Sequence, residues 1–153
     1  MLSKQVFAAN DEPIGLLAGA LRRRIRELVT ARVARFRLTA QQFWILVAVS
    51  ELSAPKLADL AARQRMDMPT ASRVMKALSA RGLVRDEGAR EDRRRSCYAL
   101  TARGRRLADQ VLPVAAEVRG AVAAALTPAE ARAVRRALRK AIDHLDRQIA
   151  RAR

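Results

Sequence analysis

Hydrophobic residues recur at spacings of three and four along most of the chain, a period that predicts amphipathic helices. The first such stripe follows the acidic start Asp11-Glu12-Pro13 and predicts a helix over about residues 13–35. Thr39-Ala40-Gln41-Gln42 then has the form of a capping box, in which the threonine and the second glutamine satisfy each other's backbone N–H groups. The helix that this box begins is apolar on nearly every side, so we expect it to be buried.

Two longer helical patterns fill the last third of the chain. The first runs from residue 102 to about residue 125 and contains Pro113, which removes one backbone hydrogen bond and should bend the helix. The second begins at the capping box Thr127-Pro128-Ala129-Glu130 and continues to the end with apolar residues at near-heptad intervals. A terminal helix with so strong a stripe usually needs a surface to cover.

Residues 53–104 carry a different order of elements. Two short helical patterns, over residues 56–64 and 68–80, have Ser53 and Asp67 as their predicted N-caps. Gly82 stands where a left-handed residue would end the second helix, and two short strands follow. Helix, turn, helix and hairpin form the order of a winged helix-turn-helix, a module that reads DNA.

The second short helix is the predicted recognition helix. Ala71, Val74, Met75 and Leu78 share one face, which leaves a polar and basic face without acids. Serine, threonine and lysine serve phosphates or bases, so individual roles stay open. The residues predicted to meet the major groove are Pro69, Thr70, Ser72, Arg73 and Lys76.

The segment after the first wing strand is crowded with arginines. A wing tip reaches the minor groove, whose negative potential favours planar guanidinium groups. The predicted wing contacts are Arg90, Arg93, Arg94 and Arg95, with Asp92 orienting an arginine because phosphates repel a carboxylate. The alternative is a solvated charged loop, as most charge runs are.

Three motifs in this region resemble the MarR family of bacterial winged-helix regulators. They are Asp92-Arg93-Arg94, then Leu100-Thr101-Ala102-Arg103-Gly104, and the helix ending Leu78-Ser79-Ala80-Arg81-Gly82-Leu83-Val84. Their order and spacing together are specific, although each is short. In the family Arg94 occupies the wing arginine position, whereas Tyr98 stands where a small aliphatic residue is more common.

The resemblance also implies a homodimer built from the first helix and the last two helices of each subunit. We therefore expect one mainly α domain over residues 1–153, with a small β-hairpin wing. Residues 38–104 would form the winged helix-turn-helix, and residues 11–37 and 105–153 the dimerization helices. The predicted interface residues are Leu17, Leu21, Val134, Leu138, Ile142, Leu145 and Ile149.

The net charge of the chain indicates what kind of partner it binds. The 153 residues include 31 Lys and Arg against 15 Asp and Glu, a formal net charge of +16. Such an excess favours a polyanion, either nucleic acid or an anionic membrane surface. No apolar run has membrane-spanning length, no signal-peptide pattern begins the chain, and the one cysteine makes no internal disulfide. We therefore expect a soluble cytoplasmic protein.

Candidate chemistry is sparse. The chain has no phosphate-binding glycine loop, no metal-ligand cluster and no nucleophile elbow, so we expect no enzyme, metal or cofactor. His144 is expected in solvent or an interface. Cys97 is either structural or a redox-active thiol beside arginines. Trp44, the single tryptophan, belongs either to the core or to a ligand pocket.

These patterns predict a sequence-specific DNA-binding transcription regulator. The resemblance implies a ligand-responsive repressor that acts as a homodimer on a near-palindromic operator in double-stranded DNA. It also implies a small aromatic anion as effector. The alternative is a basic protein that binds nucleic acid without sequence specificity, as nucleoid proteins do, or that binds an anionic surface.

Overall fold

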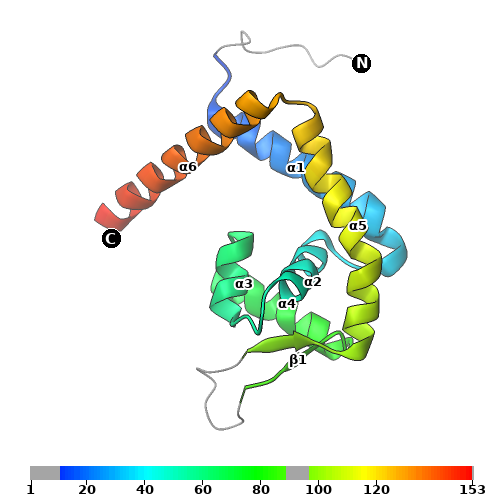
Figure 1. The fold of residues 1–153 in the computed structure, drawn as a ribbon. Coiled ribbons are helices and arrows are strands. Elements are labelled where there is room, and N and C mark those ends of the chain that lie inside the picture. The colour runs from blue at the N-terminus through cyan, green and yellow to red at the C-terminus, as the bar shows by residue number, and fades with distance from the viewer. Residues whose placement is uncertain (1–10, 89–96, 153) are drawn as a thin grey trace. The chain divides into compact units, whose positions relative to one another are not determined.

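The computed structural model describes residues 11–88 and 97–152 and is dominated by helices (Figure 1). It divides into two compact units, Met1–Ala115 and Ala116–Arg153. The elements are α1 (Ile14–Val33), the short 3-10 helix η1 (Ala34–Phe36), α2 (Ala40–Glu51), α3 (Leu57–Gln64), α4 (Met68–Ala80), β1 (Val84–Asp86), β2 (Tyr98–Leu100), α5 (Ala102–Ala124) and α6 (Pro128–Arg151).

Helix α2 is the buried centre of the first unit, as its apolar pattern predicts. It packs against α1, α3, α4 and β2. Phe43 and the five residues from Ile45 to Val49 are buried. Both halves of the predicted capping box are present, since Thr39 N–H donates to Gln42 Oε1 at 3.0 Å and Gln42 N–H donates to Thr39 Oγ1 at 3.2 Å. The box therefore fixes where this central helix begins.

Helix α4 has the bounds that the pattern predicts. Asp67 Oδ1 accepts the Thr70 N–H at 2.7 Å, and Pro69 lies in the first turn. At the other end Gly82 has φ 65°, the left-handed region in which a glycine costs least. Gly82 N–H donates to Ser79 O at 2.8 Å and Leu83 N–H donates to Leu78 O at 3.0 Å, so the helix ends in a Schellman motif.

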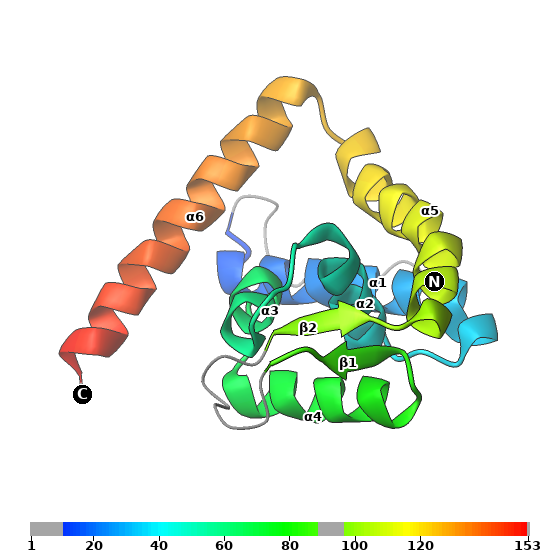
Figure 2. The ribbon, with the colours of Figure 1, turned by 60° about the horizontal axis from the view of Figure 1, so that its bottom comes forward.

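The wing strands β1 and β2 pair antiparallel beside α4 (Figure 2). The sequence pattern predicts strands over residues 83–85 and 96–100, and the observed strands begin at Val84 and Tyr98. Lys56 bridges to Cys97, and Tyr98 N–H donates to Pro55 O at 2.9 Å. The segment before α3 thus acts as a third, very short strand at the base of the wing.

The prediction that Ser53 caps α3 is wrong. The N-cap is Lys56, whose backbone N–H donates to Asp59 Oδ2 at 2.8 Å. An ammonium group accepts no hydrogen bond, so this is only the carboxylate half of a capping box. Ser53 lies too far upstream because Ala54, at φ 47°, and buried Pro55 turn the chain toward the wing before the helix begins.

Helix α5 continues through Pro113 without a break in the helix. Thr127 and Glu130 form the predicted capping box of α6, and this capping lowers the pKa of the Glu130 carboxyl because Thr127 hydrogen-bonds to it. No residue of α6 is buried. Among the described residues, no single helix is both long and apolar enough to cross a membrane. The bent pair formed by α5 and α6 meets that criterion by length and composition only.

Candidate nucleic-acid interface

The outward face of α4 is basic, as its phase predicts. Ala71, Val74, Met75 and Leu78 are buried against the rest of the first unit. The residues predicted to meet DNA share the other side, where Pro69, Arg73 and Lys76 are exposed and Thr70 and Ser72 are half-buried. This helix therefore presents cations and hydroxyl groups to solvent, while its buried side is made only of apolar residues.

Two of these side chains are tied to each other. Arg73 Nη2 donates to Thr70 Oγ1 at 3.2 Å, so the guanidinium lies back toward the start of α4. The carboxyl of Asp67 has a lowered pKa because the backbone N–H and the hydroxyl of Thr70 hydrogen-bond to it, with a smaller contribution from Arg73. The acid nearest this surface is thus occupied in capping the helix, where its charge is opposed by the helix dipole.

Met68 is a member of this surface that sequence reasoning missed. It is the first residue of α4 and is 46% exposed, an unusual exposure for so large an apolar side chain. Met68 precedes Met75 by two helical turns and so continues the edge of the buried stripe, but its position in the first turn leaves it exposed beside the polar face. The N-terminal residues of a recognition helix are those that meet base edges, so an exposed methionine there is a candidate contact.

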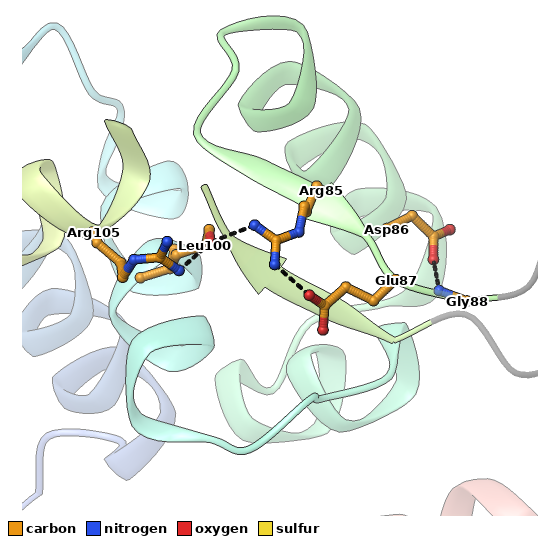
Figure 3. A network of polar contacts seen from close by, with 6 residues as sticks. All are labelled: Arg85, Asp86, Glu87, Gly88, Leu100 and Arg105. Carbon is orange, nitrogen blue, oxygen red and sulfur yellow. Dashed lines mark hydrogen bonds and ion pairs between the residues drawn. The ribbon is translucent and has the colours of Figure 1, made fainter. Parts of the chain in front are cut away.

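The wing arginines Arg90, Arg93, Arg94 and Arg95, with Asp92, lie outside the described residues. The strands on either side of that segment carry a network of polar contacts (Figure 3). Arg85 forms an ion pair with Glu87, and Gly88 N–H donates to Asp86 Oδ1 at 2.8 Å. Glu87 N–H also donates to Cys97 O at 2.7 Å, and this bond continues the pairing just beyond β1.

The carbonyl of Leu100 receives two guanidinium groups from different elements (Figure 3). Arg105 Nη1 on α5 donates to it at 2.9 Å, and Arg85 Nη1 on β1 donates at 3.4 Å. Tyr98 is half-buried in the same hairpin, and burial and the charge of Asp86 raise the pKa of its hydroxyl. A larger residue than the usual aliphatic one is therefore accommodated at the second wing strand.

The motif Leu100-Thr101-Ala102-Arg103-Gly104 has a direct physical explanation. Leu100 is buried, and Thr101 Oγ1 accepts the Gly104 N–H at 3.0 Å as the cap of α5. The same hydroxyl donates to Gly82 O at 2.7 Å, which joins the start of α5 to the end of the recognition helix. Gly104 packs directly on the backbone of Leu83, where no larger residue fits.

A hollow of about 880 Å³ lies between α1, the start of α2 and the turn after α3. Three arginines line it, and the lining residues include no Asp or Glu. Trp44, Leu38, Ile25 and Met66 add apolar and aromatic surface. Guanidinium groups beside an aromatic ring suit a small anion with a ring of its own. The lining arginines are Arg22, Arg23 and Arg26.

Trp44 contacts the core and also lines the hollow. Its ring packs edge-on against the buried Phe43 ring, with centroids 4.7 Å apart. It also lines the hollow and is half-buried rather than enclosed. Gln64 Nε2 donates to its backbone carbonyl at 3.2 Å, which links α3 to α2 at the edge of the hollow.

The predicted dimer residues are largely uncovered within the single chain. Leu17 and Leu21 are exposed on α1, together with Ile14 and Leu16, which the prediction did not include. On α6 Leu138 and Ile142 are half-buried. Val134, Leu145 and Ile149 are exposed on the same helix.

The remaining candidates show no reactive constellation. Cys97 is half-buried in the bridge to Lys56, and His144 lies 3.5 Å from Gln148 on α6. Within residues 11–88 and 97–152, no group of three or more His, Cys, Asp and Glu side chains could hold a metal ion.

Arg81 is a further residue that periodicity did not single out. Its guanidinium leaves the end of α4 and hydrogen-bonds to two carbonyl groups beside η1. The partners lie more than forty positions away in the chain, so no local pattern could indicate them.

Comparisons with known proteins agree with this geometry. The profile of the winged helix DNA-binding domain family matches residues 38–104. Among curated proteins, none matches the chain in sequence.

Solved structures match over most of the chain. The Bordetella bronchiseptica protein BpsR, whose DNA binding is regulated by 6-hydroxynicotinic acid, is 29% identical with a TM-score of 0.73, over 90% of this chain and 98% of its own. A MarR family protein of Mycobacterium tuberculosis, solved with salicylic acid, is 29% identical with a TM-score of 0.60, over 87% and 98%.

Staphylococcus aureus MepR, solved with DNA, shares the fold with a TM-score of 0.79 at 18% identity, over 88% of this chain and 99% of its own. The chain therefore contains a winged helix DNA-binding domain, and along nearly its whole length it is similar to transcription regulators of the MarR family.

Proposed function

We propose that this regulator is a repressor that binds a near-palindromic operator as a homodimer and is released by a small aromatic anion. The observation that carries the proposal is the exposed face of α4. Its cations and hydroxyl groups surround an arginine that Thr70 already holds. Bidentate arginine contacts to guanine are the commonest specific contacts in the major groove.

The reading surface comprises the outward side of α4 and the wing. Met68 would contact a thymine methyl group, while Pro69, Thr70, Ser72, Arg73 and Lys76 would meet base edges and phosphates. From the wing, Arg94 would enter the minor groove beside Arg90, Arg93 and Arg95, with Asp92 orienting one of them. The neighbour MepR, which shares this fold, was solved with DNA, and this supports DNA as the partner of the surface.

The homodimer follows from apolar surface that the single chain leaves open. Ile14 is 71% exposed on α1 and Leu145 is 58% exposed on α6, and each belongs to a row of apolar residues. Covering such rows with a second copy removes them from water. A two-fold axis would also place two recognition helices on half-sites about one helical turn apart, which favours a near-palindrome.

The hollow beside Trp44 would hold the effector. Its three arginines favour a carboxylate, and Trp44 with the apolar lining favours a ring. The neighbours solved or regulated with salicylic acid and 6-hydroxynicotinic acid support this chemical class. Release of DNA requires that the anion bind the non-reading state more tightly than the reading state.

A salt titration with two DNAs tests the central proposal. The first DNA is a site selected from a random pool, and the second is its scrambled counterpart. A sequence-specific regulator should keep a preference of roughly 10³-fold or more for the selected site at each salt concentration. Equal loss of affinity for both DNAs would instead support charge-driven binding without sequence specificity.

The single tryptophan makes effector binding directly measurable. Salicylate at up to millimolar concentration should quench Trp44 fluorescence and weaken binding to the selected site. A panel of aromatic acids that changes neither quantity would contradict the effector. A Cys97→Ser variant treated with peroxide would then distinguish control by the thiol from control by protein abundance.

A further inference from the structure

The end of the recognition helix is clamped to the end of η1 by one side chain. Arg81, the C-cap residue of α4, donates from Nη1 to Arg37 O at 2.8 Å and from Nη2 to Phe36 O at 3.1 Å. The guanidinium thus holds two successive carbonyl groups of a segment 44 and 45 residues earlier in the chain.

The chemistry of this clamp suits its position. Phe36 ends η1, and Arg37 has the left-handed φ of 55°, so carbonyl groups at this point lack helical partners. A planar fork of donors can satisfy both carbonyls at once, which a lysine ammonium cannot do in fixed geometry. The positive charge also opposes the negative dipole end of α4.

The clamped segment is continuous with a wall of the hollow. Leu38, Thr39 and Ala40 follow directly after Arg37, and all three line the hollow beside Trp44. The same Thr39 begins α2 through its capping box. A ligand that moves this wall therefore moves the carbonyls that Arg81 holds.

We propose that Arg81 is a positioning residue that transmits occupancy of the hollow to the C-terminal end of the recognition helix. This inference rests on the proposed effector site and adds the connection between that site and DNA. Helix α2 also packs on α4, so apolar contacts provide a parallel route. Arg81 adds a directional connection, since its hydrogen bonds are lost when the segment shifts by a fraction of their length.

The test measures coupling rather than affinity alone. The affinity for the selected DNA site is measured without salicylate and with saturating salicylate, and the ratio of the two dissociation constants gives the coupling. Couplings between sites are typically about 5- to 150-fold. Trp44 quenching without DNA reports the salicylate affinity of each variant separately.

Arg81→Ala should lower the coupling ratio to about one-fifth of the wild-type value or less, within the typical range of such couplings. Its salicylate affinity should stay within about threefold, because Arg81 does not line the hollow. If Arg81 were merely structural, its loss would lower thermal stability and would weaken DNA binding equally with and without salicylate. The ratio of the two DNA dissociation constants would then be unchanged. Arg81→Lys, which keeps the charge, should show the same direction of change and carries the test if the alanine variant does not fold.

Arg63→Ala is the matched control. Arg63 forms a 2.9 Å ion pair with Glu51 and so ties α3 to α2 at the surface, away from the clamp. Its loss should leave the coupling ratio at the wild-type value. A folded Arg81 variant with wild-type coupling would overturn the inference while the effector proposal stands. If salicylate neither quenches Trp44 fluorescence nor releases DNA from the wild-type protein, both the effector proposal and this inference are overturned. Because quenching is measured without DNA, it reports on the effector site independently of the coupling.

Discussion

Gly104 in the first turn of α5 lies against the backbone of Leu83, so close that a β-carbon at position 104 would sit 1.9 Å from the Leu83 oxygen. Only a glycine permits this approach, because the obstacle is backbone rather than a flexible side chain. The contact joins the wing, α5 and the end of the recognition helix at one point. It explains in physical terms why the motif beginning at Leu100 ends in glycine.

Gly104→Ala should therefore destabilise the protein. Overpacking of this kind costs about 1–3 kcal/mol, and the short distance to backbone places this case at the upper end. Denaturant unfolding measures the change. Gly120→Ala on the same helix is the control, since nothing lies within 4 Å of its added β-carbon and the substitution should be neutral or stabilising. Equal effects of the two substitutions would contradict the close approach.

The N-cap formed by the Asp67 carboxylate should make the stability of the protein depend on pH. Hydrogen bonds from Thr70 lower the pKa of this carboxyl in the folded protein. Its stabilising contribution is thus fully present above the unfolded pKa of about 3.9 and is lost as the pH falls through the lower folded-state pKa. The difference in free energy of unfolding between wild type and Asp67→Asn should shrink as the pH drops below about 4. A difference that stays constant down to low pH would argue against the cap.

Arg73→Ala should weaken binding to the selected site by about 1–3 kcal/mol if the guanidinium contacts a base edge. The fold should survive, because Arg73 is exposed and no core group is lost. Arg147→Ala removes the same charge from an exposed position on α6, on the side opposite its apolar stripe. It should change the affinity far less. Unchanged affinity of a folded Arg73 variant would remove Arg73 from the reading surface.

Met68 can be tested against a single methyl group of the DNA. Replacing thymine with uracil removes that methyl while keeping base pairing, so a double-mutant cycle with Met68→Ala isolates the contact. We expect a coupling energy of about 0.5–1 kcal/mol at one thymine of each half-site, near the value for one buried methylene. Additive losses at every thymine of the site would exclude the contact.

Replacing Ile142 and Leu145 with Asp should disrupt the proposed dimer. Two unpaired charges placed in an apolar interface would cost several kcal/mol. Sedimentation should then show monomer or aggregate. The control replaces Arg136 and Arg147 with Asp on the opposite side of α6 and should leave the dimer intact. A stable, soluble dimer of the first variant would place the interface elsewhere.

The features that the sequence determined by itself are those that depend on residues close together in the chain. Capping boxes at Thr39 and Thr127, the cap at Asp67 and the left-handed Gly82 all join residues a few positions apart. The buried and exposed faces of α4 likewise follow from a period of 3.6 residues. Such features depend on the identity of near neighbours, so one sequence is enough to predict them. Ser53 failed as a cap because its surroundings depend on a distant strand, through the bridge from Lys56 to Cys97.

Tertiary structure alone decided the features that join distant positions. The clamp from Arg81 to Phe36 and Arg37, and the approach of Gly104 to Leu83, were not predictable from periodicity. The hollow brings the arginines of α1 to Trp44 and Met66 because three helices pack around it. Periodicity states which side of a helix faces inward, but not which residue of another helix it meets. That pairing is set by how whole elements pack, and it is there that the proposed effector site and the recognition helix are connected.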